Sequence, residues 1–178
     1  MSRFAPPQDW GKRGGGGGRE RSGNTEGRGG GGLKRGVDKY NGFPKEEEAA
    51  IRRQQNNRSF FGDTIEEMHH EPRRRDLIAR GFEQPDIRTV GLGLSQPEHL
   101  AFHHIEAEID GRDPAKDPDC ISLTSRMSDR LSLTEMDRGM DRFEQLTEDP
   151  KYSNRIREEI IRRRKKFGLP VGRKNGRR

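Results

Sequence analysis

The residues of this chain that come closest to a metal site are two histidines one helical turn apart. His99 and His103 are separated by four positions and Glu106 follows three residues later, so the three side chains share one face of a helix. Imidazole and carboxylate groups are both zinc ligands. The pattern offers no fourth ligand, and histidine pairs of this kind arise readily on helices. The sequence therefore predicts no metal, no cofactor and no catalytic residue.

Positive charge that could bind phosphate gathers at both ends of the chain. The net charge of +6 divides into +5 over residues 1–36, zero over 37–80, −9 over 81–150 and +10 over 151–178. Like charges at the two ends resist compaction and attract a polyanion. Nucleic acid, and RNA in particular, is therefore the predicted partner, in preference to a small-molecule substrate or a membrane.

The N-terminal segment is of low complexity and is rich in glycine and arginine. It holds 13 of the 23 glycines and two Arg-Gly-Gly triplets, and we predict a disordered arm. Glycine lets the backbone follow a phosphate chain, while guanidinium groups pair with phosphate and stack on bases. The segment resembles the RGG boxes of RNA-binding proteins, which assigns RNA contacts to Arg13, Arg19, Arg21, Arg28 and Arg35. On composition alone, a flexible solubilising arm is the alternative.

The C-terminal segment is predicted to be a basic amphipathic helix followed by a basic tail. A cap at Ser153 or Asn154 would begin a helix that runs to Phe167. Its apolar face, formed by Ile156, Ile160 and Phe167, is narrow, so the helix should need a protein groove, RNA or a membrane surface to be stable. The predicted phosphate ligands of this segment are Arg162, Arg163, Arg164, Lys165, Lys166, Arg173 and Lys174.

The same basic run suggests a subcellular location and a protein partner. Residues 162–166, with further cations after a short gap, look like a bipartite nuclear localisation signal, which implies a nuclear import receptor and a location in the nucleus, with shuttling to the cytoplasm. Residues 164–169 resemble the repeats of mRNA-export adaptors, whose Arg-rich helices close with Arg-Phe-Gly and engage a DEAD-box helicase. Lys166 stands where that family has arginine. The resemblance implies a role in mRNA processing or export.

Two further helices are predicted in the acidic region 95–150, from capping boxes that begin at Ser95 and Ser132. Their apolar stripes either dock on a protein partner or pack together as a small helical hairpin within residues 96–147. Ser132 and Thr134 are candidate phosphorylation sites. The predicted protein-interaction residues of the chain are Phe102, Ile105, Met136, Met140, Phe143, Ile156, Ile160 and Phe167.

Residues 37–94 are predicted to be a mixed-charge flexible region with transient helices. A helix over residues 44–58 begins with proline and acidic residues but has almost no apolar face. A capping box at Thr64 predicts a second helical piece. Residues 91–95 complete neither a nucleotide-binding fingerprint nor a nucleophile elbow, so we interpret them as a hinge.

Composition predicts a chain that is mostly intrinsically disordered, with several short α-helices and no large core. Only 26% of the residues are hydrophobic, 37% are charged, and the mean hydropathy is −1.22, so burial cannot offset the entropy of ordering the whole chain. Cys120 is the only cysteine, which rules out an internal disulfide and a Cys-based zinc cluster. The predicted regions are the Gly/Arg-rich arm 1–36, the mixed-charge region 37–94, the acidic helical region 95–150 and the basic helix with its tail 151–178.

Together these features predict a non-enzymatic nuclear RNA-binding protein. It would hold RNA between its arm and its basic tail helix while the middle helices recruit proteins. The alternative is a protein-interaction adaptor, regulatory or viral, whose helices dock on folded partners and whose basic runs serve only nuclear import. We also predict that the acidic region folds back on the basic tail and competes with RNA, because the two carry opposite charge.

Overall fold

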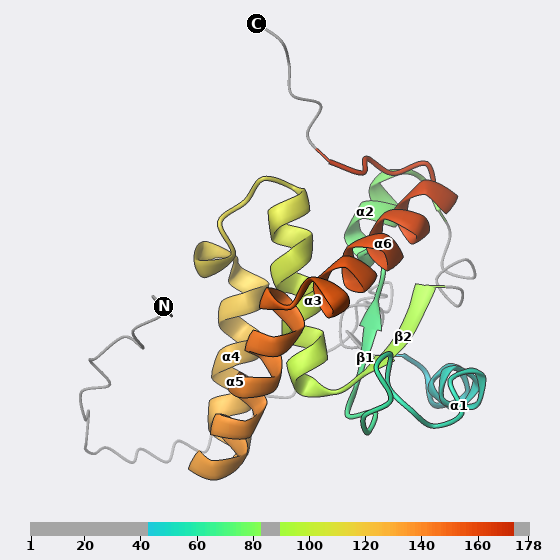
Figure 1. Cartoon of the computed structure of the whole chain (residues 1–178). Helices are drawn as coiled ribbons and strands as arrows, with labels where there is room; N and C mark the ends of the chain where they lie inside the picture. Colours follow the sequence, from blue (N-terminus) through green and yellow to red (C-terminus); the bar gives the residue numbers. More distant parts are fainter. Residues whose placement is uncertain (1–42, 83–89, 173–178) are drawn as a thin grey trace, which may run out of the picture. The chain divides into compact units, whose positions relative to one another are not determined.

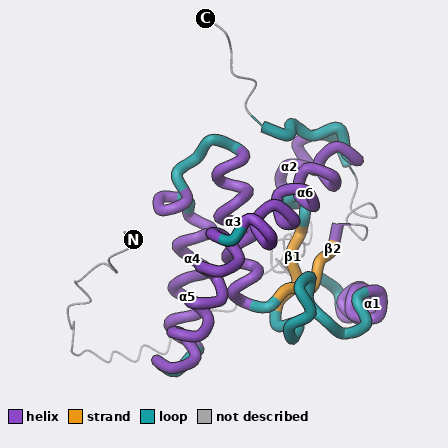
Figure 2. Tube along the Cα trace, in the orientation of Figure 1, coloured by secondary structure: helices purple, strands orange, loops and turns teal. Residues whose placement is uncertain are grey.

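A computed structural model describes residues 43–82 and 90–172 of the chain. The Gly/Arg-rich arm and the basic tail beyond residue 172 lie outside the described residues. Helices predominate and one small sheet accompanies them (Figure 1 and Figure 2). The elements in chain order are α1 (Lys45–Gln54), β1 (Glu67–His70), α2 (Arg74–Ala79), β2 (Gly91–Leu94), α3 (Gln96–Ile109), the 3₁₀ helix η2 (Pro114–Lys116), α4 (Pro118–Arg130), α5 (Leu133–Glu148) and α6 (Pro150–Lys166).

The sheet is a feature that the sequence did not predict. Strands β1 and β2 pair antiparallel, with Glu67 opposite Leu94 and His70 opposite Gly91. The helical piece predicted at Thr64 and the hinge predicted at residues 91–95 are therefore wrong over these two strands. Glycines hid the second strand: a Cβ on Gly91 would collide with the side chain of Ile51, so this residue lets α1 pack against the sheet.

The capping boxes predicted at Ser95 and Ser132 form as expected and fix where α3 and α5 begin. Ser95 Oγ accepts from the backbone N–H of Glu98, while the Glu98 carboxylate accepts from the N–H of Ser95. Ser132 and Glu135 repeat this arrangement at α5. Helix α6 starts earlier than predicted, because Pro150 can occupy its first turn.

Helix α4 was missed altogether. Its start is marked in the sequence by Asp117, whose carboxylate accepts from two backbone N–H groups of the first turn, followed directly by Pro118. Its buried side chains Cys120, Leu123 and Met127 recur at helical spacing. The Asp117-Pro118 pair therefore begins a helix.

Buried hydrophobic residues in the described part form three small clusters rather than one large core, in keeping with the low hydrophobic content. In the largest cluster, side chains of β2, α3, α5 and α6 meet, with Phe102 and Leu146 fully buried. Helix α3 lies against α4, α5 and α6 as well as the sheet (Figure 1). None of the described helices is both long and apolar enough to cross a membrane.

The acidic region and the basic tail helix contact each other directly. Arg164 of α6 donates to Asp110 at the end of α3, with Nη1 at 2.7 Å from Oδ1. On the surface of the same pair of helices, Arg157 Nη2 donates to Glu108 Oε2 at 3.0 Å. The predicted contact between oppositely charged segments is therefore present. Whether RNA competes for it remains a prediction.

Candidate metal centre

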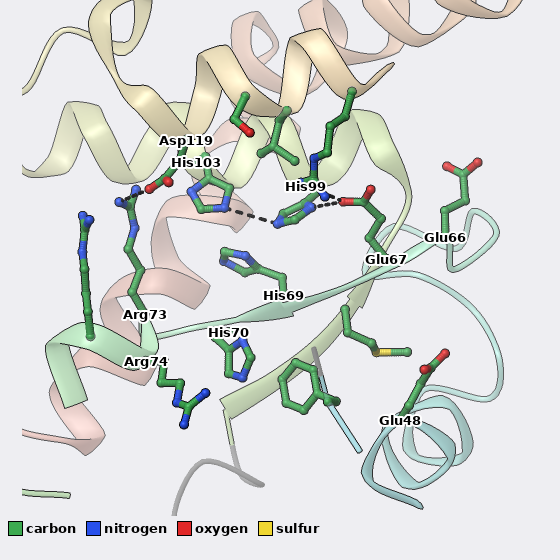
Figure 3. A pocket seen from close by; sticks show the side chains of 16 residues that line it. Glu48, Glu66, Glu67, His69, His70, Arg73, Arg74, His99, His103 and Asp119 are labelled. Atoms are coloured by element: carbon green, nitrogen blue, oxygen red, sulfur yellow. Dashed lines mark hydrogen bonds and ion pairs between the residues drawn. The ribbon is translucent and has the colours of Figure 1, made fainter. Parts of the chain in front are cut away.

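Strand β1 and helix α3 bring three imidazoles together. His69 comes from β1, and His99 and His103 come from successive turns of α3. One ring nitrogen from each lies within 4.8 Å of the others, and Figure 3 shows the three rings facing one another. The Nε2 atoms of His99 and His103 are 3.2 Å apart. Three convergent imidazoles form a ligand set for a divalent transition metal.

A carboxylate lies against the second nitrogen of each ring. The contacts are His99 Nδ1 with Glu67 Oε2, His103 Nδ1 with Glu106 Oε2 at 3.2 Å, and His69 Nε2 with Glu71 Oε2 at 3.3 Å. In metal sites, a ligating histidine usually gives its other ring N–H to such a group, which fixes the tautomer and the ring orientation. His69 and His99 have this hydrogen bond, whereas His103 Nδ1 only lies close to the carboxylate of Glu106 and has no hydrogen-bond partner in the described residues.

One pair of imidazoles is already in contact, because His99 Nε2 lies 3.2 Å from His103 Nε2. A carboxylate only accepts hydrogen bonds, so Glu67 favours the proton on Nδ1 of His99 and leaves a lone pair on its Nε2. His103 donates to this lone pair when its proton is on Nε2. When its proton is on Nδ1, both Nε2 atoms carry lone pairs and can coordinate a cation between them. In a tetrahedral zinc site with Zn–N bonds of about 2.05 Å, two nitrogens lie about 3.3 Å apart.

Two of the three histidines, His69 and His99, are held in the neutral form that binds metal. Burial, together with the charges of His103 and His99, keeps the pKa of His69 well below its usual value. Burial also lowers the pKa of His99, and this effect outweighs the opposing hydrogen bond to Glu67. That hydrogen bond is the main reason why the pKa of Glu67 is lowered. At neutral pH these two imidazoles therefore offer lone pairs, as coordination requires.

Glu71 and Glu106 lie behind the imidazoles, and the pKa values of these two carboxyls are shifted in opposite directions. Both side chains are fully buried. Burial and the negative charge of Glu106 raise the pKa of Glu71 well above its usual value. Burial alone would also raise the pKa of Glu106, but its interactions with His103 and Glu71 hold it well below that value. Glu71 therefore stays protonated, and Glu106 stays an anion that accepts from Arg73 Nε at 2.8 Å.

The imidazole cluster opens onto a pocket of about 700 Å³ whose rim carries arginines. Arg75 of α2 and Arg126 of α4 have 65% and 46% of their side chains exposed. Arg126 Nη2 and Arg130 Nη1, one turn apart on α4, each lie 3.8 Å from a carboxylate oxygen of Glu67. Guanidinium groups at the mouth of a pocket with imidazoles at its base can bind the oxygens of a phosphate ester.

A fourth histidine lines the same pocket without belonging to the cluster. His70 follows His69 on β1 and points to the other face of the sheet (Figure 3). Its ring stacks on Phe43 with the centroids 4.0 Å apart. Burial, with a smaller contribution from the charge of Arg74, lowers the pKa of His70 to about 4. At neutral pH this imidazole is uncharged and can accept a proton.

The predicted phosphate ligands are placed differently from one another. Outside the described residues lie Arg13, Arg19, Arg21, Arg28, Arg35, Arg173 and Lys174. Exposed on the last turns of α6 are Arg162, Lys165 and Lys166. Arg163 is half-buried and its Nε donates to Glu159 at 2.6 Å. The prediction that Arg164 binds phosphate is wrong. Its side chain is buried and binds Asp110, so it is not accessible to an external phosphate.

The predicted protein-interaction residues lie against one another inside the fold. Fully buried in the largest cluster are Phe102, Ile105, Ile156 and Ile160. Met136, Met140 and Phe143 are half-buried and pack on the cluster formed by Leu100, Cys120, Leu123 and Met127. Phe167 is also half-buried, and the centroid of its ring lies 5.3 Å from that of Phe82. Helices α3 and α5 pack together, as expected for the helical hairpin predicted as the alternative to docking, and α6 packs against both of them.

Sequence reasoning found the two histidines of α3 but missed the third imidazole. The sequence pattern that could have revealed His69 is an alternation of side chains with the period of a β-strand. This alternation places Glu67, His69 and Glu71 on one face. A metal was not expected because a further ligand was missing, and β1 supplies a third imidazole. Comparisons of the chain with protein-family models, with curated proteins and with solved structures find no match in any of the three.

Proposed function

We propose that this protein is a metal-dependent phosphodiesterase that acts on nucleic acid. The observation that carries this proposal is the set of three imidazoles that converge through β1 and α3, each with its second nitrogen against a carboxylate. Three histidine ligands leave a coordination position open for water or substrate, which is the arrangement of catalytic rather than structural zinc. The same set of ligands suits other first-row divalent metals.

Several features support a phosphate diester as the substrate. The pocket above the imidazoles is lined by arginines of α2 and α4, and guanidinium groups bind phosphate oxygens in pairs. The chain as a whole is basic, with a sequence pI of about 9.8, which draws it to a polyanion. The Gly/Arg-rich arm adds RNA contacts that were expected from the sequence.

The reaction supported by this arrangement is hydrolysis. His69, His99 and His103 would hold a divalent metal, which would lower the pKa of a bound water and polarise a phosphate oxygen. The water oxygen would form a bond to phosphorus while the bond to one ester oxygen breaks, and the departing oxygen would take up the proton that the water gives to solvent. The rim arginines stabilise the negative charge that develops on the phosphate oxygens.

A cleavage assay tests the proposal. The full-length chain, without an affinity tag, is incubated with plasmid DNA and with labelled single-stranded RNA in the presence of Zn²⁺, Mn²⁺ or Mg²⁺, and in EDTA. We expect cleavage that requires metal and that His103→Ala abolishes. His104→Ala is the matched control, because His104 follows on the same helix but faces Glu108 at 3.6 Å instead of the cluster. Metal-independent cleavage, or no cleavage by a metal-loaded protein, would contradict the proposal.

A second candidate is the non-enzymatic RNA-binding protein expected from the charge pattern. It is favoured by the exposed cations of α6, which are Arg162, Lys165 and Lys166. Nuclear import and RNA export remain proposals on the same residues. The adaptor alternative is less favoured, because its docking side chains such as Phe102 and Ile160 are buried. Tight, salt-sensitive RNA binding without cleavage under any metal would favour this second candidate.

A further inference from the structure

Arg164 is a buried cation from the C-terminal helix that faces the carboxyl groups behind the imidazoles. Only 5% of the residue is exposed. Its guanidinium group donates to both carboxylate oxygens of Asp110, from Nη1 at 2.7 Å and from Nη2 at 3.3 Å. Nη1 also donates to the carbonyl oxygen of Pro170 at 3.4 Å. These contacts fix the planar group in one orientation.

The remaining edge of this guanidinium group points at the acidic pair. Arg164 Nε lies 4.0 Å from Glu71 Oε1, and Nη2 lies 4.0 Å from Glu106 Oε1. Neither of these two oxygens has a hydrogen-bond partner within the described part of the chain. Through the opposite oxygens, Glu71 contacts His69 and Glu106 contacts His103. Arg164 is thus one residue away from two of the three imidazoles.

No other described cation approaches both carboxyls through its side chain in this way. Arg73 binds Glu106 through Nε, but its Nη1 is taken by Asp119 at 2.6 Å. A buried anion that loses its partner is left without compensation for the water it has lost. Without Arg164, the two carboxyl groups would have to move towards other partners, and the imidazoles that they contact would move with them.

We propose that Arg164 is a positioning residue of the imidazole cluster and that it couples the docking of α6 to metal binding. This inference rests on the proposed function, because it assumes that the cluster holds a metal. The helix supplies no ligand itself. By thermodynamic linkage, a metal that binds better when α6 is docked must in turn stabilise the docked helix.

The first test measures metal affinity. Zn²⁺ is titrated into the full chain against a competing chelator for wild type, Arg164→Met and Arg164→Lys. Removing a residue that orients ligands costs about 10- to 100-fold in metal affinity, and we expect this loss in Arg164→Met. Lysine keeps the charge but not the planar fork, so Arg164→Lys should recover part of it. The matched control is Arg157→Met, which breaks an α6-to-α3 ion pair on the surface and should leave the affinity unchanged.

The second test measures amide hydrogen exchange of α6 with and without Zn²⁺. In wild type, Zn²⁺ should slow exchange in α6, and in Arg164→Met this protection should be lost even where the helix still forms. Should Arg164→Met fail to fold, Asp110→Asn loosens the same guanidinium group while keeping its charge and replaces it in both tests.

The outcomes separate the two proposals. If wild type binds no Zn²⁺, both the proposed function and this inference fail. If wild type binds Zn²⁺ and the Arg164 variants bind it as tightly, or if Zn²⁺ leaves exchange in α6 unchanged, only the role of Arg164 is overturned.

Discussion

Zinc should stabilise the folded protein strongly, and alanine at His99 should remove most of that effect. The two Nε2 atoms of the α3 histidines are already 3.2 Å apart, within a few tenths of an ångström of the separation of about 3.3 Å that tetrahedral zinc requires. Little rearrangement is therefore needed at this pair. The ring of His99 is also held by a carboxylate, so its orientation is set before the metal arrives.

The expected size follows from linkage. At a free Zn²⁺ concentration of 100 times Kd, binding to the folded state alone adds about 2.7 kcal/mol. For a protein of this length, 1 kcal/mol shifts Tm by about 2–4 °C, so Tm should rise by about 5–11 °C. If His99→Ala weakens binding about 100-fold, the same Zn²⁺ concentration adds only about 0.4 kcal/mol and Tm moves by about 1 °C.

Differential scanning calorimetry in metal-buffered solution measures this shift. Each variant is compared with its own sample in EDTA, which cancels any effect of the substitution on the apo protein. His104→Ala should keep the full shift, because its imidazole faces away from the cluster. This expectation is refuted if Zn²⁺ does not raise Tm of the wild type, or if His99→Ala shows the same rise.

Three other predictions test the packing, the rim and the buried thiol. Ile160→Ala should cost about 2–5 kcal/mol in urea unfolding, because the side chain is fully buried; a cost near zero would return Ile160 to an external docking role. Arg126→Ala with Arg130→Ala should raise KM for RNA with little change in kcat, and lower the log–log salt slope of binding by about 1 for each phosphate that is no longer neutralised; an unchanged slope would remove them from the substrate path. Burial raises the pKa of Cys120 to about 11 from 9.0, so its thiolate fraction at pH 8 is about 100-fold lower. Alkylation in the native state should be slower by at least that factor than in urea, and stability should fall as pH rises from 9 through 11 because the unfolded thiol ionises first; equal alkylation rates would contradict the burial.

Local sequence signals were enough to predict where α3 and α5 begin. The capping boxes at Ser95 and Ser132 were predicted correctly, because the bonds of a capping box join residues only three positions apart. The shared face of His99 and His103 was likewise predicted from the period of the helix alone. The low hydrophobic content also predicted that the chain has no large core, and the described residues show none.

Contacts between distant segments decided the rest. The third imidazole reaches the cluster only because β1 pairs with β2 and lies against α3, and no local pattern places residue 69 beside residues 99 and 103. The burial of Arg164 could not be predicted from local sequence either. In the sequence it is one cation in a run of five, but in the fold it binds Asp110 and is shielded from solvent. Residue types and local periods are properties of the chain, whereas burial and the partner of a charge depend on which segments meet in three dimensions.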